Sequence, residues 1–228
     1  MVKKSSKYRR KKAKQRQRRA RKRSRSGRAM SSLSAPGRKR LKSRLEELGQ
    51  WPLLECLISQ SWQDTTQLCQ VAVARQSPAT GEVVVGGFIV DLACLGVKNA
   101  LTNLYRSAAE YRREYRRHLM ASQPLMEGDL DLAAKVIEEG TAYARSLGFN
   151  PHKDAAMALK ILGDAQPENC AQTIPLGKDG KPFFVSGPYD NVDAIMRTLN
   201  RNVGEGNYEV LIILGDPMDE WSDDDFFS

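Results

Sequence analysis

Apolar residues first recur at helical spacing near residue 40. Leu41, Leu45 and Leu48 are separated by four and three residues, so they share one side of a helix predicted over Arg38–Leu48. The following run, Trp51–Trp62, is rich in apolar residues, and we expect a second helix there. The chain therefore begins its folded part with two short helices.

Two runs rich in β-branched residues follow. Leu68–Arg75 and Val83–Cys94 predict a pair of strands, and the breaker residues 77–81 supply the turn between them. The second run is apolar at nearly every position, which indicates a strand covered on both faces. Gly86 and Gly87 in its middle predict a bulge or a close backbone approach.

The period of the pattern then changes from two residues to between three and four. Lys98–Met120 predicts a long helix, and residues 129–147 predict a strongly amphipathic one that ends at Gly148. A shorter helix is expected from Asp154 to Leu162. This central part of the chain is therefore predicted to be helical throughout.

The last part of the chain returns to strand patterns. Ile174–Leu176 and Phe183–Val185 flank an Asp-Gly pair at 179–180, which predicts a hairpin. A helix over Val192–Asn202 and a final buried strand over Tyr208–Leu214 are expected. This mixed order predicts an α+β fold, a mainly antiparallel sheet with packed helices, preceded by a disordered basic arm.

Charge divides the chain into unlike parts. The first 44 residues carry 21 of the 36 Lys and Arg and none of the 27 Asp and Glu, so residues 45–228 are acidic overall. We expect a disordered polycationic arm at 1–37, because like charges with no apolar residues to bury cannot offset the entropy of ordering. An α+β domain at 38–215, one unit or two subdomains (38–165 and 166–215), and a disordered acidic tail at 216–228 complete the prediction.

A polycationic arm gains affinity for a polyphosphate by releasing condensed counterions. Arginine outnumbers lysine in it, which suits phosphate contacts and stacking on unpaired bases, so RNA is favoured over DNA. A nuclear-import address and a solubilising tail are the alternatives. No apolar run is long enough for a membrane span, and no membrane partner is expected. The predicted nucleic-acid contacts in the arm and first helix are Lys11, Lys12, Arg16, Arg18, Arg19, Arg21, Lys22, Arg23, Arg25, Arg38, Lys39 and Arg40.

Arginines and tyrosines also alternate in the long predicted helix. Arg112, Arg113, Arg116 and Arg117 are candidates for RNA phosphate contacts, with neighbouring tyrosines stacking on bases. The alternative is a solvated face whose tyrosines pack on the sheet while the arginines pair with acidic residues of the body. Both interpretations stay open at this point.

A catalytic site is harder to identify. Asp91, His152 and Asp154 are the candidates for a metal-assisted phosphodiester hydrolase, although their spacing does not require it. The four cysteines form no CxxC pair, so we expect buried thiols, no metal site and no cofactor. A nuclease or other nucleic-acid-processing enzyme is therefore the alternative function, and a protein-binding acidic body tethered by the arm is another.

Three segments, FIVDLACLGVKNA, GFNPHKD and GKDGKPFFVSGPYDN, resemble an uncharacterised bacterial protein family over about residues 51–214. The resemblance implies no activity, cofactor or site residue. From the residues themselves we expect an RNA-binding, ribonucleoprotein-associated protein. It would be cytoplasmic if bacterial and nuclear or nucleolar if eukaryotic.

Overall fold

The computed structural model describes residues 35–48, 51–187 and 190–212, with side chains from residue 40 onwards. Its contacts divide the chain into two units, Met1–Arg44 and Leu45–Ser228. The predicted arm and acidic tail lie largely outside the described residues. The helix α2, Ala35–Glu47, confirms the first predicted helix, and Leu45 and Leu48 on its apolar side are buried.

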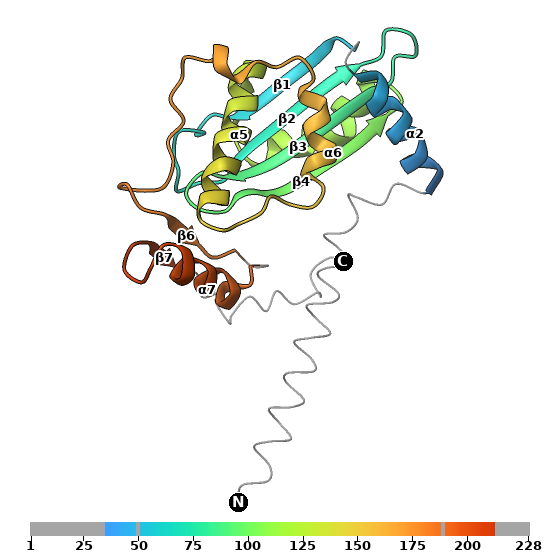
Figure 1. Cartoon of the computed structure of the whole chain (residues 1–228). Helices are drawn as coiled ribbons and strands as arrows, with labels where there is room; N and C mark the ends of the chain where they lie inside the picture. Colours follow the sequence, from blue (N-terminus) through green and yellow to red (C-terminus); the bar gives the residue numbers. More distant parts are fainter. Residues whose placement is uncertain (1–34, 49–50, 188–189, 213–228) are drawn as a thin grey trace, which may run out of the picture. The chain divides into compact units, whose positions relative to one another are not determined.

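A five-stranded antiparallel sheet forms the centre of the second unit (Figure 1). The strands are arranged in the order β4-β3-β2-β1-β5, so the first four are neighbours in chain order and β5 returns to the far edge. Their bounds are Leu53–Ser59 for β1, Cys69–Gln76 for β2, Val83–Asp91 for β3, Gly96–Tyr105 for β4 and Leu125–Glu127 for β5.

Helices cover both faces of this sheet. One face carries α5 and the short α6, which Figure 1 shows lying across the strands. The other face carries a helical segment whose buried tyrosines pack on β1, β2 and β3. On the first face, α5 spans Leu130–Ser146 and α6 spans Ala155–Ala158, followed by 3-10 turns at Leu159–Leu162 and Pro167–Asn169. The segment on the opposite face consists of α3 (Ala108–Tyr111), the π-helical turn η3 (Arg112–Arg116) and α4 (Arg117–Ser122). The predicted α+β class is confirmed.

The predicted helix at Trp51–Trp62 is wrong, because this segment forms β1. Cys56, Leu57 and Ile58 are all buried, since β1 lies between β2 and β5 and is covered by helices on both faces. A short strand buried on both faces has a continuous apolar run, and periodicity alone cannot distinguish such a run from a buried helix.

The predicted helix at Lys98–Met120 is correct only in its second half. Its first residues belong to β4, which pairs with β3 from Gly96 to Tyr105. Helix α3 begins after Ser107, whose side chain accepts a hydrogen bond from the backbone N–H of Glu110. Up to the N-cap Ser107, pairing with β3 therefore determines the structure of this segment despite its helical sequence pattern. The helix forms only after Ser107.

Gly86 confirms the predicted close backbone approach, because a Cβ there would lie 3.1 Å from the carbonyl oxygen of Ala158, and side chains approach both glycines, one on each face of the sheet. A Cβ at Gly86 would lie 2.5 Å from Cγ2 of Ile161, and a Cβ at Gly87 would collide with the hydroxyl of Tyr115. The β3–β4 register is continuous at both glycines and shifts only between Ile89 and Val90. Both faces of β3 therefore depend on missing side chains for their packing.

The C-terminal elements form a small layer of their own. Strand β6 (Phe183–Val185) pairs in parallel with β7 (Glu209–Leu211), and helix α7 (Val192–Asn202), predicted at these bounds, connects them. The predicted hairpin is wrong, because Ile174–Leu176 is not a strand and the Asp-Gly turn closes only one bridge. The predicted buried strand at Tyr208–Leu214 is also only partly correct, since β7 is short and largely exposed.

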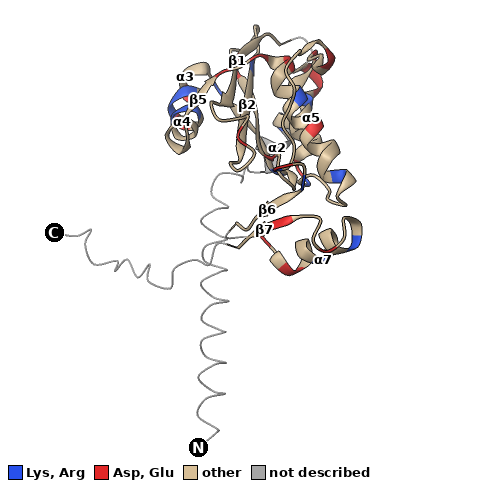
Figure 2. Ribbon diagram, turned by 90° about the vertical axis from the view of Figure 1, so that its left-hand side faces the viewer, with Lys and Arg blue, Asp and Glu red and all other residues tan. Residues whose placement is uncertain are grey.

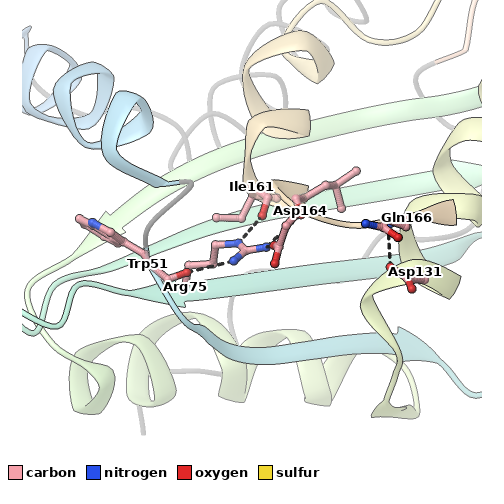
Figure 3. A network of polar contacts seen from close by, with 7 residues as sticks. Trp51, Arg75, Asp131, Ile161, Asp164 and Gln166 are labelled. Carbon is pink, nitrogen blue, oxygen red and sulfur yellow. Dashed lines mark hydrogen bonds and ion pairs between the residues drawn. The ribbon is translucent and has the colours of Figure 1, made fainter. Parts of the chain in front are cut away.

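One buried arginine connects three segments of the second unit (Figure 3). Arg75, at the end of β2, is 3% exposed and donates hydrogen bonds to the backbone oxygens of Trp51, Ile161 and Leu162. It also pairs with the exposed carboxylate of Asp164 at 2.5 Å. The guanidinium of Arg75 therefore provides hydrogen-bond donors to backbone carbonyl groups that lie just outside, or at the end of, a strand or helix.

Within the described residues, no helix has the length and apolar character needed to cross a membrane.

Candidate functional site

The basic residues predicted from the sequence fall into two groups. Those in the arm, from residue 11 to residue 25, lie outside the described residues, as do the side chains of Arg38 and Lys39. Arg40 in α2 is exposed. The second group lies on the helical segment α3–η3–α4, which is described in full.

Buried tyrosines anchor this helical segment to the sheet. Tyr111 and Tyr115 are 1% and 3% exposed, and their rings stack with centroids 6.1 Å apart. Tyr105 of β4 lies beside both rings. Burial raises the pKa of all three phenols, that of Tyr105 to about 12, so they stay neutral. Because their rings form part of the core, Tyr111 and Tyr115 are not available to stack on bases.

The arginines of the same segment lie in η3 and at the start of α4, and Figure 2 shows this basic stretch of ribbon between the labels α3 and α4. Arg113 pairs with its neighbour Glu114 at 2.8 Å, with both side chains mostly exposed. Arg112 and Arg117 are exposed, and within the described chain their guanidinium groups join no hydrogen bond or ion pair. The segment therefore presents cations on a support whose tyrosines hold it in place.

Arg116 differs from its neighbours because it is tied to β1. Its Nε donates to Oε1 of Glu55 at 2.6 Å, and the hydroxyl of Tyr111 donates to Oε2 of the same carboxylate at 2.7 Å. The side chains of Glu55 and Arg116 are 13% and 33% exposed. Such charge-assisted hydrogen bonds are among the stronger ones in proteins, so Glu55 fixes η3 against the edge of the sheet.

A cavity of about 480 Å³ opens beside this contact. β5 pairs only with Leu57, Ile58 and Ser59, so the first part of β1 continues past it without a strand on that side among the described residues. The cavity lies in this gap. It is lined by Leu53, Leu54 and Glu55 of β1, Arg112 and Arg116 of η3, and Glu127 at the end of β5.

The candidate Asp91 lies on a different part of the sheet. It is 6% exposed at the end of β3, and its Oδ1 accepts hydrogen bonds from the backbone N–H groups of Ala93 and Cys94. Burial raises the pKa of Asp91, and the charge of Lys98 acts in the opposite direction. Its described hydrogen bonds hold the turn between β3 and β4.

Lys98 connects this region to the segment before α7. Its Nζ lies 2.8 Å from Oδ2 of Asp190, and both side chains are less than one-fifth exposed. The same Oδ2 accepts from the backbone N–H of Gly187. A hydrogen bond from the N–H of His152 to the carbonyl of Val97 brings a third segment to β4. Segments 88–100, 148–154 and 177–191 are thus in contact here.

The other two catalytic candidates lie together. His152 Nδ1 is 3.8 Å from Oδ2 of Asp154, and the side chain of Asp154 is 55% exposed. In the described ranges, no three His, Cys, Asp or Glu residues are grouped as a metal ion requires. Asp91, His152 and Asp154 are therefore not brought together as a metal-binding set.

Sequence reasoning missed Glu55, Glu127 and the cavity. Glu55 is the one charged residue in the apolar run expected to be a helix, and such an isolated charge could have been a signal. No sequence pattern indicated Glu127, because its position at the cavity depends on where the short β5 ends relative to β1.

Comparison of the chain with protein-family models, with curated proteins and with solved structures found no match.

Proposed function

We propose that this protein binds single-stranded RNA, with the basic arm supplying most of the affinity and the α3–η3–α4 segment supplying contacts at fixed positions. The observation that carries the proposal is the segregation of charge. All acidic residues follow residue 45, whereas 21 of the 36 cations precede it. A polyanion gains free energy from such an arm through counterion release.

The geometry of the body supports a more specific role than a tether. Because residues 45–228 are acidic overall, a polyanion is repelled from most of the body. Arg112 and Arg117 are exposed with no partner among the described residues, so their guanidinium groups have donors to offer a ligand. Arg117 thus contacts a phosphate of the RNA backbone, and the buried tyrosines position the segment that carries both arginines.

The affinity of such a protein for RNA is expected to fall steeply as the salt concentration rises. Full-length protein binds a labelled single strand, a duplex RNA and a duplex DNA, with the single strand bound most tightly. If six or more phosphates of the single strand are contacted, its affinity falls by about 300-fold or more between 50 and 200 mM salt. Fluorescence anisotropy of the labelled nucleic acids, titrated with protein at several salt concentrations across this range, measures this fall in affinity.

The matched variant replaces the nine arm cations predicted between residues 11 and 25 by Gln. It is expected to lose most of the affinity and most of the salt dependence. Unchanged binding by this variant, or wild-type protein that binds none of the three nucleic acids, would contradict the proposal.

A further inference from the structure

The cavity at the edge of the sheet is built from two sides. Along β1, the register with β2 shifts between Leu53 and Glu55, so one extra residue, Leu54, forms a bulge. Bulges of this kind redirect side chains and are common beside functional sites. On the other side, the π-helical turn η3 brings Arg112 and Arg116 to the rim, and π-helical turns are also frequent at functional sites.

The charged side chains that line the cavity differ in their hydrogen bonds and ion pairs. Glu55 is engaged by Tyr111 and Arg116. By contrast, the side chains of Arg112 and Glu127 are both exposed and join no hydrogen bond or ion pair in the described part of the chain. Glu127 acts on Arg116 only through its charge. One guanidinium and one carboxylate at the rim therefore have their hydrogen-bonding capacity open to a ligand.

The cavity also offers apolar surface. Leu53 is 43% exposed, and Leu54 beside it is half-buried and also packs against the core cluster that contains Tyr111 and Tyr115. A ligand that suits this lining has a flat apolar face and an edge that both donates and accepts hydrogen bonds. Nucleobases have this character, and proteins that read single-stranded RNA bind their exposed edges.

We infer that this cavity binds a guanine base of single-stranded RNA, an inference that rests on the proposed function. Guanine alone among the four bases presents two adjacent donors, N1–H and N2–H₂, which match the two oxygens of the Glu127 carboxylate. Its O6 and N7 accept from a guanidinium in the bidentate manner that proteins commonly use, which matches Arg112. Leu53 and Leu54 contact the face of the base.

The other bases fit this pair of side chains less well. Adenine and cytosine place one amino group beside a ring nitrogen acceptor, and uracil has a single N–H between two carbonyls. Each would leave one oxygen of the Glu127 carboxylate without a donor, or place an acceptor against it. Because unpaired polar groups at a binding site lower affinity, the expected discrimination is about 10-fold or more.

The test uses the full chain and three heptamers, U₃GU₃, U₃AU₃ and U₇, with anisotropy at fixed salt. Wild type is expected to bind U₃GU₃ about 10-fold or more tightly than either other strand. Glu127→Gln should abolish this preference while affinity for U₇ changes little. Arg112→Lys, which keeps the charge but loses the bidentate donor, should reduce the preference.

Glu138→Gln is the matched control, because Glu138 is an exposed residue of α5 that does not line the cavity. It removes the same charge and should keep the guanine preference. Equal affinity of wild type for all three heptamers would overturn the inference while leaving the proposed RNA binding intact. A guanine preference that survives Glu127→Gln would overturn it as well. Absence of binding to every heptamer would remove the proposed function and this inference together.

Discussion

Arg75 shows how a single buried cation can stabilise the fold through backbone acceptors. Its three carbonyl partners lie on segments that no strand pairing connects, namely Trp51, Ile161 and Leu162. Replacing it by an apolar residue removes the donor of the Trp51 and Ile161 oxygens, whereas the oxygen of Leu162 still accepts from the backbone N–H of Ala165. Stability therefore depends on the guanidinium donors more than on its ion pair.

We predict that Arg75→Met lowers the free energy of unfolding by about 2 kcal/mol or more, because the oxygens of Trp51 and Ile161 lose their donor and each unsatisfied buried group costs about 1–3 kcal/mol. Asp164→Asn removes only the ion pair with a side chain that is 79% exposed, and should cost at most about 1 kcal/mol. Urea denaturation of both variants measures the difference. Equal losses would show that the ion pair, and not the carbonyl contacts, carries the stabilisation.

Asp91 is expected to make stability depend on pH. Burial raises its pKa in the folded state above the unfolded value of about 3.9. The stabilisation that protonated Asp91 gives the folded state is therefore fully present below the pKa of the unfolded state. It is lost as pH rises through the pKa of the folded state. Asp91→Asn keeps an oxygen for the N–H groups of Ala93 and Cys94 but carries no charge.

We predict that Asp91→Asn gains stability relative to wild type as pH rises from about 4 to 7, by the linkage just described. Urea denaturation at each pH measures the difference between the two proteins. A difference that changes in the opposite direction would show that attraction to Lys98 outweighs the cost of burial.

At the scale of elements, β3 is the strand on which both helical layers depend. Gly87 leaves room for the hydroxyl of Tyr115, and Gly86 leaves room for Ile161 on the other face. Tyr115 in turn holds η3, from which Arg112 and Arg116 reach the cavity. The missing side chains of β3 therefore help to place the candidate site.

We predict that Gly87→Ala lowers the free energy of unfolding by about 1–3 kcal/mol, because the added methyl group is forced against Tyr115. Tyr115→Phe removes the obstructing hydroxyl, so the double variant should lose less than the sum of the two single losses. Thermal and urea denaturation of the four proteins complete the cycle. Strict additivity would contradict this account of the packing.

Local pattern was enough to predict the elements whose environment is simple. The amphipathic helix at 129–147 and the helix Val192–Asn202 each bury one side, and both are found as expected. Pattern failed at β1 and at the start of β4, where pairing with other strands decides the structure. The Arg/Tyr helix was expected, but the burial of its tyrosines depends on Gly87 and the sheet, which no local pattern reveals.

At the scale of the whole molecule, charge is arranged by position in the chain. The acidic character of residues 45–228 keeps non-specific contacts of the body with a polyanion weak. Arg112 and Arg117 are exposed cations within this acidic body, on the α3–η3–α4 segment that the buried tyrosines hold against the sheet. If the protein binds RNA as proposed, affinity comes from the arm and placement from the body, and substitutions can remove these two contributions one at a time.

The salt dependence of single-stranded RNA binding tests this division most directly. Wild type, the arm variant with nine Gln substitutions and Arg117→Gln are compared as full-length chains. Each lost phosphate contact reduces the slope of log K against log salt by about 0.7, so Arg117→Gln should lose about 0.7 and the arm variant several units. An Arg117→Gln variant with the slope and affinity of wild type would show that the body makes no phosphate contact there, and would contradict the account.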